Sequence, residues 1–231
     1  PERAPNPLLV LEDVSAGYAD KVVLKGITTS IQAEQRIGLL GVNGAGKSTL
    51  IKTIAGVQPV LSGSAVFNKG LQIGYFAQHQ VEMLRDDQSP LWHLKKIAAS
   101  NIREQDLRNY LGSFNFPGEM ATGPVEHFSG GEKARLALAL IVWQKPNLLL
   151  PDEPTNHLDL DTREALAVAL AQFEGTLVLV SHDRHLLRAT TDQFLIVADG
   201  RLQPFDGDLE DYREWLFRTK LAPEAVAVPL P

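Results

Sequence analysis

The chain has 231 residues, of which 44% are hydrophobic and 22% are charged, an ordinary balance for a soluble globular protein with a sizeable core. It has no cysteine, which excludes a disulfide framework, a thiolate zinc site and a cysteine nucleophile. The net charge of −6 argues against a broad basic face for nucleic acid, and no apolar run approaches the roughly 20 residues that span a bilayer. The chain starts at Pro1 without a signal-peptide pattern, so we expect an excised piece of a cytoplasmic protein.

The first half of the chain predicts strands followed by a helix and a helical insertion. Apolar or alternating runs predict strands, and a run with helical spacing that ends in glycine predicts a helix at 47–56. The expected strands cover 8–14, 22–31, 36–41, 64–68 and 71–78. Residues 89–128 contain helix formers and breaks without a buried-strand run, so we expect an inserted helical subdomain there.

The second half predicts a buried parallel sheet. Near-continuous apolar strands at 147–153 and 176–182 are separated by a helix at 162–173, and another helix, at 129–144, precedes them. Such strands, separated by helices, indicate a mostly parallel sheet covered on both faces. The rest predicts a hairpin, a closing helix and a loose tail, at 192–205, 208–220 and 221–231.

The segment GVNGAGKST, residues 41–49, matches the phosphate-loop pattern G-x-x-x-x-G-K-[ST] between an expected strand and an expected helix. A chance glycine-rich turn is the alternative, which this strand–loop–helix order disfavours. Lys47 would reach the β- and γ-phosphates, and Ser48 would offer a hydroxyl to Mg²⁺. The other loop residues expected to line the nucleotide are Gly41, Asn43, Gly44, Ala45, Gly46 and Thr49.

Two carboxylates, Asp152 and Glu153, end the apolar strand that begins near residue 147. An isolated Asp-Glu pair usually lies in a solvated loop. Beside a phosphate loop, however, Asp152 would hold the Mg²⁺ shell and Glu153 would orient or deprotonate a water at the γ-phosphate.

These motifs together resemble one family. The segment FSGGEKARLALAL (128–140) is similar to the signature sequence of ATP-binding cassette (ABC) ATPases, and the phosphate loop, DEPTNHLD and VSHDR stand in that family's order. The resemblance implies an α/β P-loop NTPase fold of the ABC ATPase type: a mostly parallel core sheet, an antiparallel β-subdomain and an inserted α-helical subdomain. A single domain, 1–231, would then have its nucleotide-binding core in 1–88 and 129–220.

The resemblance also implies roles for residues around the chain's own nucleotide. Tyr18 would stack on adenine, Gln78 would touch Mg²⁺ and the attacking water, and His182 would hydrogen-bond the γ-phosphate. Without the resemblance, the tyrosine would be read as partial core and the histidine as a polar cap at a strand end. The other histidines show no ligand spacing, so we expect no transition-metal site.

A second set of residues would serve the ATP of a partner domain. In the family, the segment Ser129, Gly130 and Gly131 binds the γ-phosphate of a second, head-to-tail ABC domain, and Asp159 lies at the contact between the domains. The plain alternative for Ser129 is a helix N-cap, and both roles are compatible.

The NHLD and VSHDRHLL segments resemble the ABC-F branch. With PFDGDLEDY near the end, they most resemble the C-terminal ABC domain of its bacterial members, and the family resemblance runs from about Leu8 to about Leu216. The resemblance implies a second ABC domain in the same parent chain, no membrane partner, and a ribosome and tRNA as partners in translation. Two alternatives stay open: the nucleotide-binding subunit of a membrane transporter, and a module that switches on ATP without turnover.

Pro151 departs from the family pattern, which has an aliphatic residue before the aspartate. Proline removes a backbone donor from an expected central strand. It could therefore shift Asp152 and Glu153, and it keeps the switch without turnover open.

Overall fold

The computed structural model describes residues 6–156 and 158–226. A six-stranded sheet lies at its centre, with the order β5-β6-β7-β3-β8-β9. Its strands are parallel except for β9, which pairs antiparallel with β8. Their bounds are β3 (Arg36–Leu40), β5 (Ile73–Phe76), β6 (Leu148–Pro151), β7 (Thr176–Val180), β8 (Gln193–Ala198) and β9 (Arg201–Phe205).

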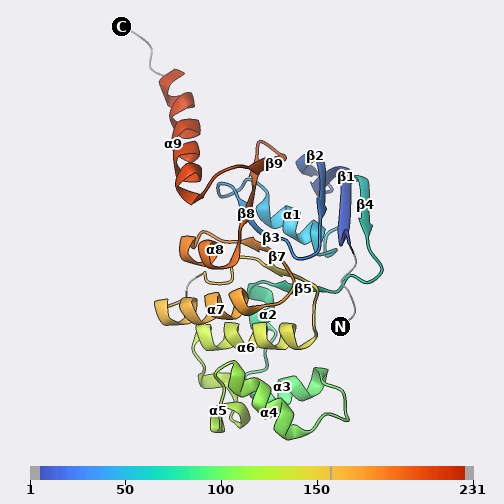
Figure 1. Cartoon of the computed structure of the whole chain (residues 1–231), viewed down its shortest axis with the longest axis vertical. Helices are drawn as coiled ribbons and strands as arrows, with labels where there is room; N and C mark the ends of the chain where they lie inside the picture. Colours follow the sequence, from blue (N-terminus) through green and yellow to red (C-terminus); the bar gives the residue numbers. More distant parts are fainter. Residues whose placement is uncertain (1–5, 157, 227–231) are drawn as a thin grey trace.

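A smaller antiparallel sheet has the order β2-β1-β4. It is formed by β1 (Leu9–Tyr18), β2 (Lys21–Ile31) and β4 (Ser62–Phe67). Figure 1 shows it beside α1 (Lys47–Ile54), the helix that follows β3. The expected mostly parallel sheet and antiparallel β-subdomain are therefore both present.

The side chains of β6 alternate between two hydrophobic cores, one on each face of the central sheet. Leu148 and Leu150 belong to the core cluster that contains residues of α1 and of the smaller sheet. Leu149, between them, points to the opposite cluster, against α6 (Gly130–Trp143), α7 (Leu160–Gln172) and α8 (Arg184–Thr190). Because successive strand side chains point to opposite faces, one apolar run serves both cores.

A separate cluster of helices lies below the central sheet in the view of Figure 1. It contains α3 (Pro90–Ile97), α4 (Glu104–Ser113), α5 (Glu119–Thr122) and a 3₁₀ turn (Val125–His127). Its own core includes Leu94, Leu111 and Phe116, which pack with Leu136 of α6. We propose 89–128 as the limits of this subdomain.

Two elements differ from their expected extent. The strand expected over 71–78 stops at Phe76 because α2 (Gln78–Glu82) begins at once, with the Gln80 side chain accepting a hydrogen bond from the Ala77 N–H. The closing helix α9 (Leu209–Val226) runs further than expected, so a loose tail was wrong for 221–226, where leucine, alanine and glutamate favour helix. Residues 227–231 lie outside the described residues.

Within the described chain, no helix combines the length and the apolar character needed to cross a membrane.

Candidate functional site

The phosphate loop turns between β3 and α1 in a conformation that requires glycine. A Cβ on Gly41 would lie 2.7 Å from the carbonyl oxygen of Val197, in the neighbouring strand β8. Gly46, at φ 110°, is the N-cap residue of α1, and its Cβ would lie 2.9 Å from a methyl carbon of Val23. The loop therefore leaves the N–H groups that begin α1 available for an anion.

Lys47 is buried at the start of α1. Its Nζ donates to the Gly41 carbonyl oxygen at 2.7 Å and lies 3.4 Å from Nε2 of His182. Burial lowers the pKa of Lys47, and the carboxylates of Glu153 and Asp152 act in the opposite direction. The lysine is thus held as a pre-oriented donor at the mouth of the loop.

Asp152 and Glu153 are fixed by backbone hydrogen bonds to two different strands. The Asp152 N–H donates to Phe76 of β5 at 2.8 Å, and the Glu153 N–H donates to Val180 of β7 at 2.8 Å. Glu153 has φ 50°, in the left-handed region that costs a non-glycine residue about 1–3 kcal/mol. This strained turn directs the glutamate toward His182, whose Nε2 lies 3.2 Å from Oε1 of Glu153.

The pKa values of both carboxyl groups are raised above their ordinary values. Burial raises the pKa of Glu153, an effect opposed by His182 and Lys47. Burial also raises the pKa of Asp152, opposed first by a hydrogen bond from Tyr75 and then by Lys52. Each carboxylate is therefore partly desolvated but faces cations, as expected where a charged ligand is to be bound.

Two neighbouring cavities meet at Ser48 and Glu153. The first, of about 500 Å³, is the phosphate-loop cavity, and its lining residues include Asn43, Gly44, Gly46, Lys47, Ser48, Thr49, Glu153, Asn156 and His182. The second, of about 550 Å³, is lined by Ser48, Lys52, Tyr75, Gln78, Asp152 and Glu153, among others. A hydroxyl, an amide and a carboxylate on one wall are hard oxygen donors of the kind that Mg²⁺ prefers. The residues expected to hold the metal therefore fit it.

Tyr18 lies outside both cavities. It ends β1 with 52% of its surface exposed, opposite Lys21 in the antiparallel ladder. Lys21 does line the phosphate-loop cavity, so the tyrosine stands one cross-strand pair away from it.

The residues expected to serve the ATP of a partner domain lie at two helix N-termini, outside the two cavities. Ser129 is the N-cap of α6: its Oγ accepts from the Glu132 N–H at 3.1 Å, and the Ser129 N–H donates back to Glu132 at 3.0 Å. Asp159 likewise caps α7 by accepting from the Thr162 N–H at 2.8 Å. None of Ser129, Gly130, Gly131 and Asp159 is among the described residues that line the two cavities.

The α6 and α7 helices meet where these caps lie. A Cβ on Gly131 would come within 2.2 Å of the Thr162 side chain. The glycine therefore allows α6 to approach α7 closely, and Thr162 links the cap of α7 to the signature segment.

Sequence reasoning missed several residues of the site. Tyr75, Lys52, Lys21 and Val23 line the cavities but belong to no motif, and Asn156 lines one although the DEPTNHLD motif gave it no role. A signal was available for Tyr75, which stands three residues before Gln78 in a strand expected to end at the site.

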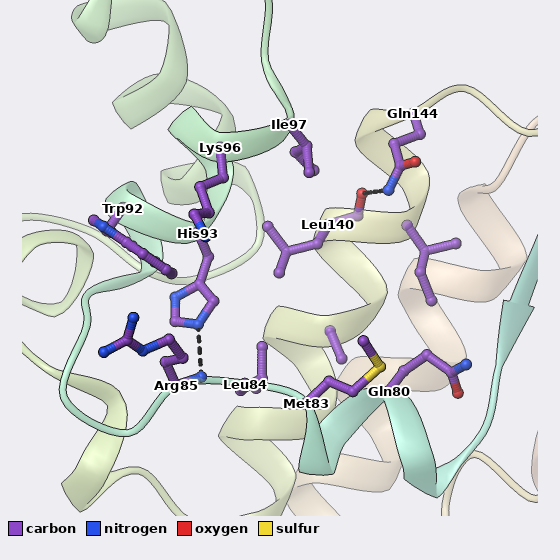
Figure 2. A pocket seen from close by; sticks show the side chains of 12 residues that line it. Gln80, Met83, Leu84, Arg85, Trp92, His93, Lys96, Ile97, Leu140 and Gln144 are labelled. Carbon is purple, nitrogen blue, oxygen red and sulfur yellow. Dashed lines mark hydrogen bonds between the residues drawn. The ribbon is translucent and has the colours of Figure 1, made fainter.

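A third cavity lies away from Lys47, between α2, α3 and α6 (Figure 2). It holds about 380 Å³. At its edge the Arg85 N–H donates to Nε2 of His93 at 2.9 Å, while Nδ1 of that ring lies 2.7 Å from the Ser89 carbonyl oxygen. Much of its lining is apolar, from Leu84, Ile97 and Leu140 among others, which does not suit a phosphate group.

Comparison with known proteins decides the family. The profile described as "ABC transporter" matches residues 24–156, which include the phosphate loop and both carboxylates. The chain belongs to the ABC transporter family.

Curated relatives place it near the F branch of that family. It is 61% identical over 216 residues to "Probable ATP-binding protein YheS" of Escherichia coli K12, covering 94% of this chain and 34% of that protein. It is 39% identical to "ABC transporter F family member 3" of Arabidopsis thaliana, covering 91% of this chain and 29% of that protein. The expected resemblance to bacterial ABC-F proteins is confirmed. The chain spans about a third of the length of the relatives it matches.

Solved structures confirm the expected fold class. "Structure of ATP binding subunit of ABC transporter" is 26% identical, with a TM-score of 0.71 over 90% of this chain and 93% of that one. A dimeric ATP-binding cassette in a post-hydrolysis state, bound to ADP and Pi, is 20% identical, with a TM-score of 0.69 over 86% of this chain and 99% of that one. At that identity the second likeness shows the fold alone.

Proposed function

We propose that the chain is an ABC domain that binds and hydrolyses ATP within a longer, soluble ABC-F protein. The observation that carries this proposal is the convergence of Lys47, Glu153 and His182, with polar atoms 3.2–3.4 Å apart, on the cavity at the phosphate loop. A cation, a base and a second donor around an anion-binding loop suit phosphoryl transfer.

Phosphate binding would come from the loop and from α1. The N–H groups at the start of α1 face the phosphates, and Lys47 leaves its contact with Gly41 to reach the β- and γ-phosphates. Ser48, Gln78 and Asp152 would hold Mg²⁺, which neutralises phosphate charge when bound. Tyr18 would stack on the adenine.

Hydrolysis would proceed by in-line attack of water on the γ-phosphorus. Glu153 orients the water and accepts its proton as the new P–O bond forms, while the bond to the β-phosphate oxygen breaks. His182 contacts a γ-phosphate oxygen, and Lys47 stabilises the charge that develops. The products are ADP and phosphate.

A second ABC domain would complete the site. Ser129, Gly130 and Gly131 begin a helix away from the chain's own cavity, as a head-to-tail arrangement requires, and Asp159 lies beside them at the cap of α7. The similar cassette with ADP and Pi is described as dimeric. We expect the isolated chain to hydrolyse ATP weakly, because half of each composite site belongs to its partner.

Domain closure on ATP and release after hydrolysis would be coupled to ribosome binding in the cytoplasm. The similarity to F-family relatives supports this part of the proposal. The chain itself carries a net charge of −6, so contacts to RNA phosphates would come from other parts of the parent protein.

Co-sedimentation with ribosomes tests the coupled function. The parent protein would carry Glu153→Gln together with the equivalent change in its other ABC domain, and would be centrifuged with ribosomes with and without ATP. Pelleting only with ATP is the expected result. Folded, ATP-bound protein that stays in the supernatant would contradict the ribosome role and favour a transporter subunit.

A further inference from the structure

Tyr75 is a polar side chain of the site that belongs to no motif. It lies in the middle of β5, where its partner in the parallel ladder with β6 is Leu150. Leu150 and Asp152 are two residues apart along the chain, so their side chains lie on the same face of the sheet as that of Tyr75. The strand register therefore brings the tyrosine hydroxyl to the carboxylate.

The hydroxyl of Tyr75 donates to Oδ2 of Asp152 at 3.4 Å. The ring packs against the core cluster that contains Leu148, Leu150 and residues of α1, so the donor sits on an anchored side chain. A phenylalanine would fill the same apolar space. The hydrogen bond to Asp152 is therefore what distinguishes tyrosine from phenylalanine at this position.

This contact fixes one oxygen of a two-oxygen ligand. With Oδ2 bound by Tyr75, the Asp152 carboxylate cannot rotate freely, and it lines the same cavity as Ser48. Partners that orient a metal-binding carboxylate typically change metal affinity by about 10–100-fold when removed.

We propose that Tyr75 is a positioning residue, which holds the Asp152 carboxylate in the orientation that binds the Mg²⁺ of the nucleotide. This inference rests on the proposed function of the site. It gives β5 a role in metal binding of its own, in addition to leading the chain to Gln78 at the start of α2.

Calorimetric titration with a non-hydrolysable ATP analogue tests the role. The affinity of the full 231-residue chain would be measured in Mg²⁺ and in EDTA, and their ratio is the gain due to the metal. Tyr75→Phe should leave the affinity in EDTA within about twofold of wild type and reduce the gain by on the order of tenfold.

Tyr110→Phe is the matched control. Its hydroxyl donates to the Ala139 carbonyl oxygen at 2.7 Å, in the helical cluster away from the cavities. The same chemical change there should leave the metal-dependent gain unaltered. Thermal unfolding of each variant would verify that both chains are folded.

A double-mutant cycle shows whether Tyr75 acts through Asp152. In an Asp152→Asn background, the effect of Tyr75→Phe on the gain should disappear. A wild-type gain in Tyr75→Phe, or an equal loss in Mg²⁺ and in EDTA, would overturn the inference. A wild-type chain that binds no nucleotide under either condition would instead refute the proposed function.

Discussion

The Nε2 atom of His182 lies 3.2 Å from Oε1 of Glu153. The two residues follow adjacent parallel strands, β7 and β6, and the hydrogen bond from the Glu153 N–H to Val180 sets their separation. A residue that could activate water and a residue that could contact a γ-phosphate are therefore held together before any ligand binds.

Glu153→Gln should stabilise the unliganded chain near pH 7. Burial raises the pKa of Glu153, so its ionised form is less favourable in the folded than in the unfolded chain. The stabilisation that the protonated carboxyl provides is full below its ordinary pKa of 4.5 and is lost as the pH rises through the raised value.

We expect a higher Tm at pH 7, by about 2–4 °C for about 1 kcal/mol, with a gain that shrinks toward pH 4.5. Differential scanning calorimetry at several pH values would measure it. Glu164→Gln, on the exposed side of α7, is the control and should change the Tm little. A lower Tm for Glu153→Gln at pH 7 would disprove the prediction.

His182→Ala should slow hydrolysis without abolishing ATP binding. Loss of one donor to a developing oxyanion costs about 10²–10³-fold in rate, whereas Lys47 and the loop would still bind the phosphates. Single-turnover formation of ADP would measure the rate. His185→Ala, at an exposed position of α8, should react at the wild-type rate. Equal rates for the two variants would remove His182 from the mechanism.

Gly131→Ala and Gly130→Ala should differ in stability. A Cβ on Gly131 would lie 2.2 Å from the Thr162 side chain, whereas one on Gly130 would meet nothing within 4 Å. Overpacking of this kind costs about 1–3 kcal/mol, so we expect only Gly131→Ala to lower the free energy of unfolding. Urea unfolding of both variants checks this, and equal values would show that α6 can move away from α7 without cost.

Pro151→Leu should raise the Tm. Asp152 donates its N–H to β5 and Glu153 to β7, so by alternation the donor missing at Pro151 faces β7. The ladder between β6 and β7 pairs Leu149 with Leu177 and resumes only at the bridge between Asp152 and Val180.

Restoring that donor should contribute about 1 kcal/mol, or about 2–4 °C. Pro204→Leu is the control, because Pro204 is exposed in the edge strand β9, where proline is tolerated. Thermal unfolding would compare the two. An unchanged or lower Tm for Pro151→Leu would contradict the prediction.

Local chemistry made part of this site predictable. The phosphate loop and the Asp152–Glu153 pair are contiguous in sequence, so each shows its residue types, its spacing and its flanking strand or helix. The roles of Tyr18 and His182 came from family resemblance, because neither has a local pattern. The contacts of Tyr75 depend on which strand β5 pairs with, and the order β5-β6-β7-β3-β8-β9 is set by packing between segments far apart in the chain.

Local patterns also failed at the ends of elements. The cap by Gln80 shortens β5, and α9 continues to Val226, beyond the end expected at residue 220. Close approaches such as that of Gly131 to Thr162 join residues from different helices. Only the packed structure shows them.

The most direct test of the account is the fate of bound nucleotide in the Glu153→Gln chain. Labelled ATP and Mg²⁺ would be bound to wild-type chain and to Glu153→Gln in excess, and the bound nucleotide would be identified over time. We predict that the wild-type chain converts its bound ATP to ADP. Glu153→Gln should convert its ATP at a rate lower by about 10²–10⁴-fold, so that its bound nucleotide stays ATP. Equal conversion by both chains would contradict the assignment of Glu153 and, with it, the proposed mechanism.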